Sequence, residues 1–187
     1  KSFITAYMIS RFKRKTAIIL HSTSMLEQWE NDVLNTCLPG TTIGYYHAKK
    51  KKDGDIILMI MGSAALSEFT LNKKTMSAIE FYNQFGFIVY DECHMYANKN
   101  AGKALSIAQA PYMLGLSATP DENINKFDRM VWWSIGPVIK ASDLKGYVST
   151  DNDFKAIVHR INYNGSPLYT RLIKNAVTDM TSVTETI

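Results

Sequence analysis

The stretch FGFIVYDECHMYA, residues 85–97, holds an apolar run that stops abruptly on two carboxylates, a thiol and an imidazole. The apolar residues are branched or aromatic, which is typical of a strand buried on both faces of a parallel sheet. Asp and Glu are depleted in strands, so the polar residues mark at least the point where the strand leaves the core. These polar residues are Asp91, Glu92, Cys93 and His94.

Four further segments share this strand-like character, because each is short, continuously apolar and rich in branched or aromatic residues. The segments are residues 16–21, 42–46, 55–61 and 112–118. Helical periodicity separates them and predicts helices at residues 2–14, 24–37, 75–85 and 101–109. Strands that alternate with helices predict an α/β fold, in which helices flank both faces of a parallel sheet.

Residues 24–37 show the clearest helical pattern. Ser24 and Glu27 have the S-x-x-E spacing of a capping box, and Pro39-Gly40 follow the last periodic residue. We therefore expect one helix that is capped at Ser24 and ends before Pro39.

Composition excludes several classes of protein. A chain of 187 residues with 46% hydrophobic content can bury one good core and begin a second domain. Its two cysteines show no pairing pattern, and no apolar stretch approaches the ~20 residues that cross a bilayer. We expect a soluble intracellular protein without a membrane partner, in the cytoplasm or nucleus. The net charge of +4 permits a polyanionic partner without requiring one.

A metal site is one alternative role for the cluster at residues 91–94. Structural zinc needs about four ligands at spacings such as C-x2-C. The chain has only Cys37 and Cys93, and they are far apart in the sequence. A different ligand is therefore the better hypothesis.

Polar residues also follow two other predicted strands. Ser22 and Thr23 come after the strand at 16–21, and Ser117 and Thr119 close the last strand. In parallel sheets, ligands bind outside the carboxyl ends of the strands. A plain strand end does not predict that three polar clusters share one sheet edge, so this edge is the candidate site.

Several motifs resemble those of superfamily 2 helicases. DECH at 91–94 is similar to the DEAD/DEAH box, LSATP at 116–120 to motif III, and ILHSTSMLEQW at 19–29 to motif Ia. KFDRMVWWSIGPVI at 126–139 resembles the branch of XPB-type and large-DNA-virus helicases, with restriction-enzyme translocases nearby. The resemblance to this branch also agrees with a viral or phage protein that acts inside its host cell.

The resemblance implies a domain organisation. Residues 1–140 would form the first RecA-like domain, which binds ATP. A more polar pattern begins after Gly136-Pro137, so we place a linker at 141–152 and the start of a second RecA-like domain at 153–187.

The resemblance also implies an ATP site with magnesium. Lys1-Ser2 match the last two residues of the family's phosphate-binding loop, so Lys1 would contact the outer phosphates and Ser2 the magnesium ion. Asp91 would hold the same ion, usually through water, because magnesium keeps much of its hydration shell. Glu92 would orient or deprotonate the attacking water. Cys93, at the variable position of the box, would serve packing.

Coupling and nucleic-acid binding are implied for the neighbouring motifs. His94 would link the ATP site to Ser117 and Thr119, whose hydroxyls donate and accept hydrogen bonds. The predicted contacts to the nucleic-acid backbone are Ser22, Thr23, Gly62 and Ser63. Such contacts read no sequence, and only the branch resemblance favours DNA over RNA.

The first residue, Lys1, and the last, Ile187, lead us to interpret the sequence as a piece of a longer protein. The glycines of the phosphate loop would precede Lys1, and a transition-state arginine would come from the second domain. We therefore expect the chain alone to fold but to show no measurable nucleic-acid-stimulated ATPase. The alternatives are the motor subunit of a restriction system and a non-hydrolysing nucleic-acid-binding module of the same fold.

Overall fold

The computed structural model describes residues 1–146 of the chain, except residues 49, 100, 119–127 and 144. Two compact units are present, residues 1–140 and residues 141–187. Most of the second unit lies outside the described residues, so the linker and the second RecA-like domain stay predictions.

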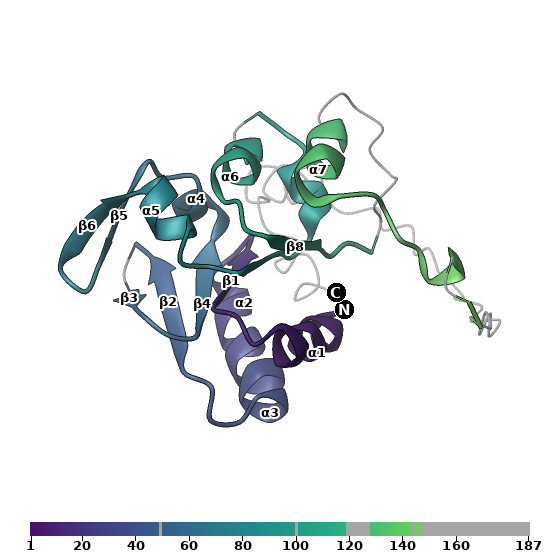
Figure 1. Cartoon of the computed structure of the whole chain (residues 1–187), viewed down its shortest axis with the longest axis horizontal. Coiled ribbons are helices and arrows are strands. Elements are labelled where there is room, and N and C mark those ends of the chain that lie inside the picture. Colours follow the sequence, from purple (N-terminus) through teal and green to yellow (C-terminus); the bar gives the residue numbers. More distant parts are fainter. Residues whose placement is uncertain (49, 100, 119–127, 144, 147–187) are drawn as a thin grey trace, which may run out of the picture. The chain divides into compact units, whose positions relative to one another are not determined.

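A six-stranded sheet forms the centre of the first unit (Figure 1). Its strands lie in the order β3-β2-β4-β1-β7-β8, and all neighbours are parallel except the antiparallel pair of β2 and β3. The strands are β1 (Thr16–Leu20), β2 (Ile43–His47), β3 (Lys50–Lys52), β4 (Ile56–Ile60), β7 (Phe87–Tyr90) and β8 (Tyr112–Gly115). The predicted α/β fold with a parallel sheet is confirmed.

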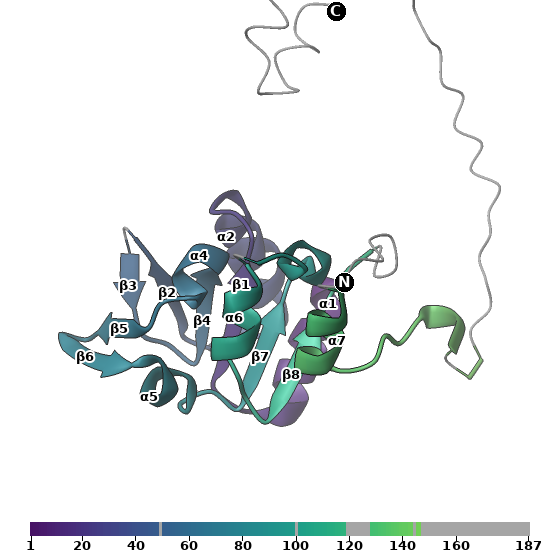
Figure 2. The same ribbon diagram turned by 90° about the horizontal axis from the view of Figure 1, so that it is seen from above.

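Helices cover both faces of the sheet (Figures 1 and 2). Alternate residues of a strand point to opposite faces, so Ile18 of β1 packs under one helical layer and Ile19 under the other. The first layer consists of α1 (Ser2–Phe12) and a continuous helical segment made of α2 (Ser24–Glu27), η1 (Gln28–Leu34) and α3 (Asn35–Cys37). The second layer consists of α4 (Met61–Ala64), α5 (Ala78–Tyr82), η2 (Cys93–Tyr96), α6 (Gly102–Ile107) and α7 (Asp128–Ile135).

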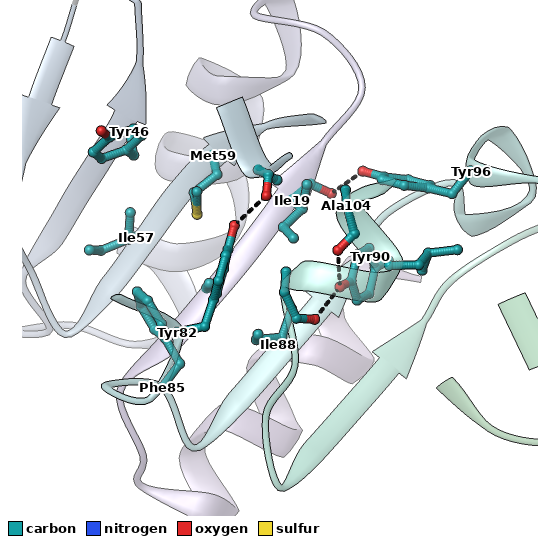
Figure 3. Packing of buried hydrophobic residues seen from close by; sticks show 14 of the residues in the cluster. Ile19, Tyr46, Ile57, Met59, Tyr82, Phe85, Ile88, Tyr90, Tyr96 and Ala104 are labelled. Carbon is teal, nitrogen blue, oxygen red and sulfur yellow. Dashed lines mark hydrogen bonds between the residues drawn. The ribbon is translucent and has the colours of Figure 1, made fainter. Parts of the chain in front are cut away.

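Three buried tyrosines between the sheet and the second helical layer donate their hydroxyls to backbone carbonyls (Figure 3). Tyr82 donates to the carbonyl of Ala64 at 2.8 Å, and Tyr90 donates to the carbonyl of Ala108 at 2.5 Å. Tyr96 donates to the carbonyl of Ile19 at 3.2 Å. Each bond avoids the free energy that an unpaired buried hydroxyl would cost. The third bond also ties the turn after β7 to β1.

The helical segment at residues 24–37 has the predicted bounds, but the predicted capping box is wrong. Ser24 is the first helical residue, and the N-cap is Thr23, which makes no side-chain capping bond. The Ser24 hydroxyl instead lies 2.7 Å from the Ser22 hydroxyl. The seven central residues form the wider turns of a π-helix, a form that is frequent at functional sites.

The predicted helix at residues 75–85 is also wrong at its start, where residues 75–77 belong to strand β6 (Lys74–Ser77). This strand forms a hairpin with β5 (Glu68–Leu71), beside β3 (Figures 1 and 2). Its turn residues Asn72 and Lys73 both have positive φ, as a tight hairpin turn requires. The usual sequence signal for this turn is Asn-Gly, and this chain has Lys73 in the position of the glycine.

A capping box is present at the start of the shortened helix α5. The hydroxyl of Ser77 accepts a bond from the backbone N–H of Glu80, and the Glu80 carboxylate accepts one from the N–H of Ser77 at 2.8 Å. The backbone N–H and the hydroxyl of Ser77 both donate to the Glu80 carboxylate, and these two bonds lower the pKa of that carboxyl. Within the described part of the chain, no helix has both the length and the apolar character that a bilayer span needs.

Candidate active site at the carboxyl edge of the sheet

The carboxyl ends of β1, β4, β7 and β8 form one edge of the sheet. The register pairs Ile19 of β1 with Met59 of β4 on one side and with Tyr90 of β7 on the other, so these strands end together. The backbone N–H of Leu116, just after β8, donates to the carbonyl of Tyr90 at 2.9 Å. The three polar clusters predicted from the sequence therefore do follow neighbouring strands.

The carboxylate of Asp91 is buried, with 4% of the residue exposed, and both of its oxygens accept hydrogen bonds. Oδ2 accepts from the indole Nε1–H of Trp29 at 3.0 Å, and Oδ1 accepts from the backbone N–H of Glu92 at 3.1 Å. A carboxylate oxygen has two lone pairs, so each keeps one for another ligand. The group is thus fixed in orientation and still able to bind a hydrated magnesium ion.

Glu92 has a left-handed backbone conformation, with φ 47° and ψ 54°. A non-glycine residue in this region costs about 1 kcal/mol or more, and such residues gather at active sites. The next N–H, that of Cys93, donates to the carbonyl of Leu116 at 2.8 Å and so holds the turn in place. The turn directs the Glu92 side chain away from the path of β7.

The Glu92 carboxylate lies between two cationic or protonatable groups. One oxygen accepts a hydrogen bond from the ammonium of Lys1, and the other lies 3.4 Å from Nδ1 of His94. The same Nδ1 lies 2.9 Å from the hydroxyl of Ser117. Lys1, Glu92, His94 and Ser117 therefore form one chain of polar contacts.

Cys93 is buried beneath this polar chain. Burial and, to a smaller extent, the nearby Glu92 carboxylate raise the pKa of the Cys93 thiol to about 11. A Cβ at Gly115 of β8 would lie only 3.0 Å from the Cys93 sulfur, so the thiol fills a tight space. Zinc binds the thiolate form, which is scarce for such a thiol at neutral pH. Among the described residues, no three His, Cys, Asp or Glu side chains gather as a metal-binding group.

We predict that Cys93 resists alkylation in the native chain. The partly exposed Cys37 should react with iodoacetamide at pH 8 about tenfold faster or more, because the buried Cys93 is protonated. Mass spectrometry of peptides from timed samples gives both rates. In denaturant the two rates should converge, and equal rates in the native chain would contradict the assignment of Cys93 to packing.

The predicted nucleic-acid contacts lie at the ends of β1 and β4, the central strands of this edge. Thr23 is exposed, and Gly62 is exposed with no atom within 4 Å of the position of a Cβ. Within the described residues, neither Gly62 nor Ser63 hydrogen-bonds to another predicted site residue. An open backbone next to hydroxyls is suited to contact with a phosphate.

Two residues that the sequence analysis did not single out contribute to this edge of the sheet. Thr119 lies outside the described residues, and Ser2 begins α1 directly after Lys1. The sequence interpretation missed Trp29 as a partner of Asp91 and Tyr96 as the anchor of the turn. A buried indole N–H or phenol needs a partner, and this requirement was the available signal.

Residues 1–122 match the family described as type III restriction enzyme, res subunit (ResIII). The chain belongs to this family. The resemblance to superfamily 2 helicases is thereby confirmed, and the sheet described above is the first RecA-like domain of such a protein.

Several curated relatives carry helicase names. The African swine fever virus protein named "Putative ATP-dependent RNA helicase QP509L" is 29% identical over 174 residues, which is 89% of this chain and 31% of that protein. "Putative DNA 3'-5' helicase Rad25" of Halobacterium salinarum is 29% identical over 107 residues, or 57% of this chain and 16% of that protein. The chain thus spans about a third or less of the length of these curated relatives.

A solved structure has the same fold. The UvsW helicase from bacteriophage T4 superposes on 72% of this chain and 47% of its own chain, with a TM-score of 0.50 and 20% sequence identity. At this level of identity the likeness concerns the fold and not the activity.

Proposed function

We propose that this domain binds and hydrolyses ATP as part of a nucleic-acid-stimulated motor, a helicase or translocase. The observation that carries the proposal is the polar chain from Lys1 through Glu92 and His94 to Ser117, beside the fixed carboxylate of Asp91. Hydrolysis of a nucleoside triphosphate needs a cation on the phosphates, a carboxylate for magnesium and a group that orients water. The carboxyl edge of this sheet supplies one residue of each kind.

Lys1 and Glu92 exchange partners in this proposal. The Lys1 ammonium forms an ion pair with the Glu92 carboxylate. The outer phosphates of ATP attract Lys1, which leaves one Glu92 oxygen free to orient or deprotonate the attacking water. In this proposal, the Glu92 carboxylate can therefore act on the attacking water only when ATP has drawn Lys1 away.

Asp91 and Ser2 fit magnesium by the chemistry of their donors. A carboxylate and a hydroxyl are hard oxygen ligands, and both Asp91 oxygens keep a lone pair. Bound magnesium would neutralise charge that develops on the transferred phosphate. Asp91 would act through the magnesium's water shell, because its two hydrogen bonds hold it in place.

His94 connects this reaction to the rest of the motor. Its Nδ1 lies close to both Glu92 and Ser117, so a movement of the loop after β8 changes the surroundings of the Glu92 base. We propose that His94, Ser117 and Thr119 report nucleic-acid binding and closure of a second RecA-like domain to the ATP site. Such a domain would also supply a transition-state arginine, which is worth on the order of a thousandfold in rate.

Ser22, Thr23, Gly62 and Ser63 are proposed to hold the nucleic-acid backbone. Their support is the exposed position of Thr23 and Gly62 at the ends of neighbouring parallel strands. DNA is the proposed substrate because the motifs resemble the XPB-type branch. One relative is named an RNA helicase and another a DNA helicase, so the experiment below includes both.

The motor subunit of a restriction system is a second candidate, and the description of the ResIII family favours it. The two candidates share this domain and differ in whether DNA is cut. Incubation of plasmid DNA with ATP and magnesium separates them, because only the restriction system yields linear product.

When this chain continues into a complete second RecA-like domain, ATP hydrolysis is expected to rise about tenfold or more on addition of single-stranded or duplex DNA, whereas the 187-residue chain alone should show no measurable stimulation. Phosphate release is measured on the 187-residue chain and on a protein in which it continues into a complete second RecA-like domain. RNA of the same length serves as the comparison substrate. Tight ATP binding with no turnover on any nucleic acid would favour the non-hydrolysing binding module instead.

A further inference from the structure

Trp29 connects two parts of the candidate site that are far apart in the sequence, the Asp91 carboxylate and the segment at residues 22–24. It is 1% exposed, and its indole N–H donates to Oδ2 of Asp91 at 3.0 Å. It also belongs to the helical segment that begins directly after Ser22 and Thr23. We propose that Trp29 is a positioning residue, which orients the magnesium-binding carboxylate of Asp91 and couples it to the nucleic-acid segment at 22–24. The inference rests on the proposed function.

The contact is built into the core and does not depend on a flexible surface side chain. Trp29 packs in the first layer with Leu26, Val33 and Leu34, all buried beside Ile18 of β1. The large indole ring therefore has little freedom to turn. Its N–H can reach a partner only where the ring edge meets the end of β7.

The orientation of Asp91 depends on this bond. Among the described residues, the other oxygen, Oδ1, accepts from the N–H of Glu92, the next residue in the chain. A bond to the adjacent residue leaves the carboxylate free to swing about its own side-chain torsion. The indole, which comes from a separate element, fixes that torsion. Loss of a partner that orients a metal ligand typically weakens metal binding 10- to 100-fold.

The same indole provides a path from nucleic acid to the ATP site. Residues 22 and 23 precede the first turn of the helical segment, and Trp29 lies less than two turns further along it. A rigid helix that shifts when a phosphate binds at its start carries its buried side chains with it. A shift of the indole changes the Asp91 carboxylate directly, without passing through His94.

The test uses two variants of Trp29 and a matched control in the 187-residue chain. Trp29→Phe removes the donor and part of the ring. Replacement of Trp29 by β-(3-benzothienyl)alanine exchanges only the N–H for sulfur and keeps the shape. Trp133→Phe changes an indole that is 81% exposed on α7. Calorimetry then measures ATP affinity with magnesium and with EDTA, and the ratio of the two gives the gain from magnesium.

We expect the gain in ATP affinity from magnesium to be about tenfold smaller in both Trp29 variants than in the parent chain. Their ATP affinity in EDTA should be unchanged. The Trp133 variant should match the parent chain. In nitrogen–proton spectra, the indole resonance of Trp29 should move on Asp91→Asn, and on addition of magnesium and ATP, more than those of the other tryptophans. It should also move when single-stranded DNA is added.

Three outcomes would overturn the inference. A full magnesium gain in the benzothienyl variant, even with a lower melting temperature, would show that Trp29 serves stability alone. An unmoved Trp29 resonance in Asp91→Asn would show that the contact is absent in solution. No magnesium gain in the parent chain would refute the proposed magnesium–ATP site and the inference together, whereas the first two outcomes leave the proposed function intact.

Discussion

Glu92→Gln should reduce nucleic-acid-stimulated ATP hydrolysis by about 100-fold or more, while ATP binding is retained. The amide keeps the shape of the carboxylate but can neither take a proton nor form the ion pair with Lys1. General-base contributions are typically 10²- to 10⁴-fold in rate. Binding should be equal or slightly tighter, because Lys1 is more available to the phosphates.

Phosphate release and ATP calorimetry on the same preparation separate the two effects of Glu92→Gln. Glu68→Gln, which removes an exposed carboxylate on β5, should behave like the parent protein. Turnover is measured in a protein that contains this chain and a complete second RecA-like domain. Stimulated hydrolysis near the parental rate in the Glu92 variant would remove Glu92 from the catalytic role.

The parallel strands were predictable because each is an apolar run followed by polar residues. Burial of β1 and β7 on both faces requires a continuous apolar sequence, and the polar residues that follow them cannot lie in the core. The shared edge then follows from parallel direction alone. The sequence pattern therefore predicts the position of Asp91 at the carboxyl edge of the sheet.

Contacts between residues that are far apart in the sequence were not predictable in the same way. Trp29 shares the apolar face of its helix, and nothing in that pattern says that its N–H meets Asp91, 62 positions away. The left-handed conformation of Glu92 also carries no sequence signal, since that conformation usually belongs to glycine. The bond from the N–H of Cys93 to Leu116 supports it, and this bond exists only once β7 and β8 have paired.

The prediction of secondary structure was wrong where local helix propensity competed with tertiary contacts. Residues 75–77 fit a helical pattern, yet they pair with β5, where Phe69 and Leu71 are buried against the second layer. The hairpin is tied to the main sheet by a bond from the N–H of Thr70 to the hydroxyl of Tyr46 at 2.9 Å. A helix starting at residue 75 would leave the buried residues of β5 without a partner strand.

His94→Ala should lower nucleic-acid stimulation of ATP hydrolysis about tenfold, while basal hydrolysis and ATP binding change little. The imidazole Nδ1 lies 2.9 Å from the Ser117 hydroxyl and 3.4 Å from Glu92, so its removal cuts the contact between the ATP site and the loop after β8. Glu92 and Asp91 keep their other partners, Lys1 and Trp29, which preserves the basal reaction. Phosphate release with and without DNA gives the stimulation ratio.

Ser117→Ala gives the comparison that assigns this effect to the His94–Ser117 contact. If the two side chains act as one link, the double variant should be no worse than the more severe single variant, because residues that share an interaction are not additive. His47→Ala, at the end of β2, removes an imidazole away from this contact and should leave the ratio unchanged. Additive losses in the double variant would separate the two roles. Equal loss of basal and stimulated hydrolysis in His94→Ala would place the imidazole in the chemical step, as a partner of Glu92, rather than in coupling.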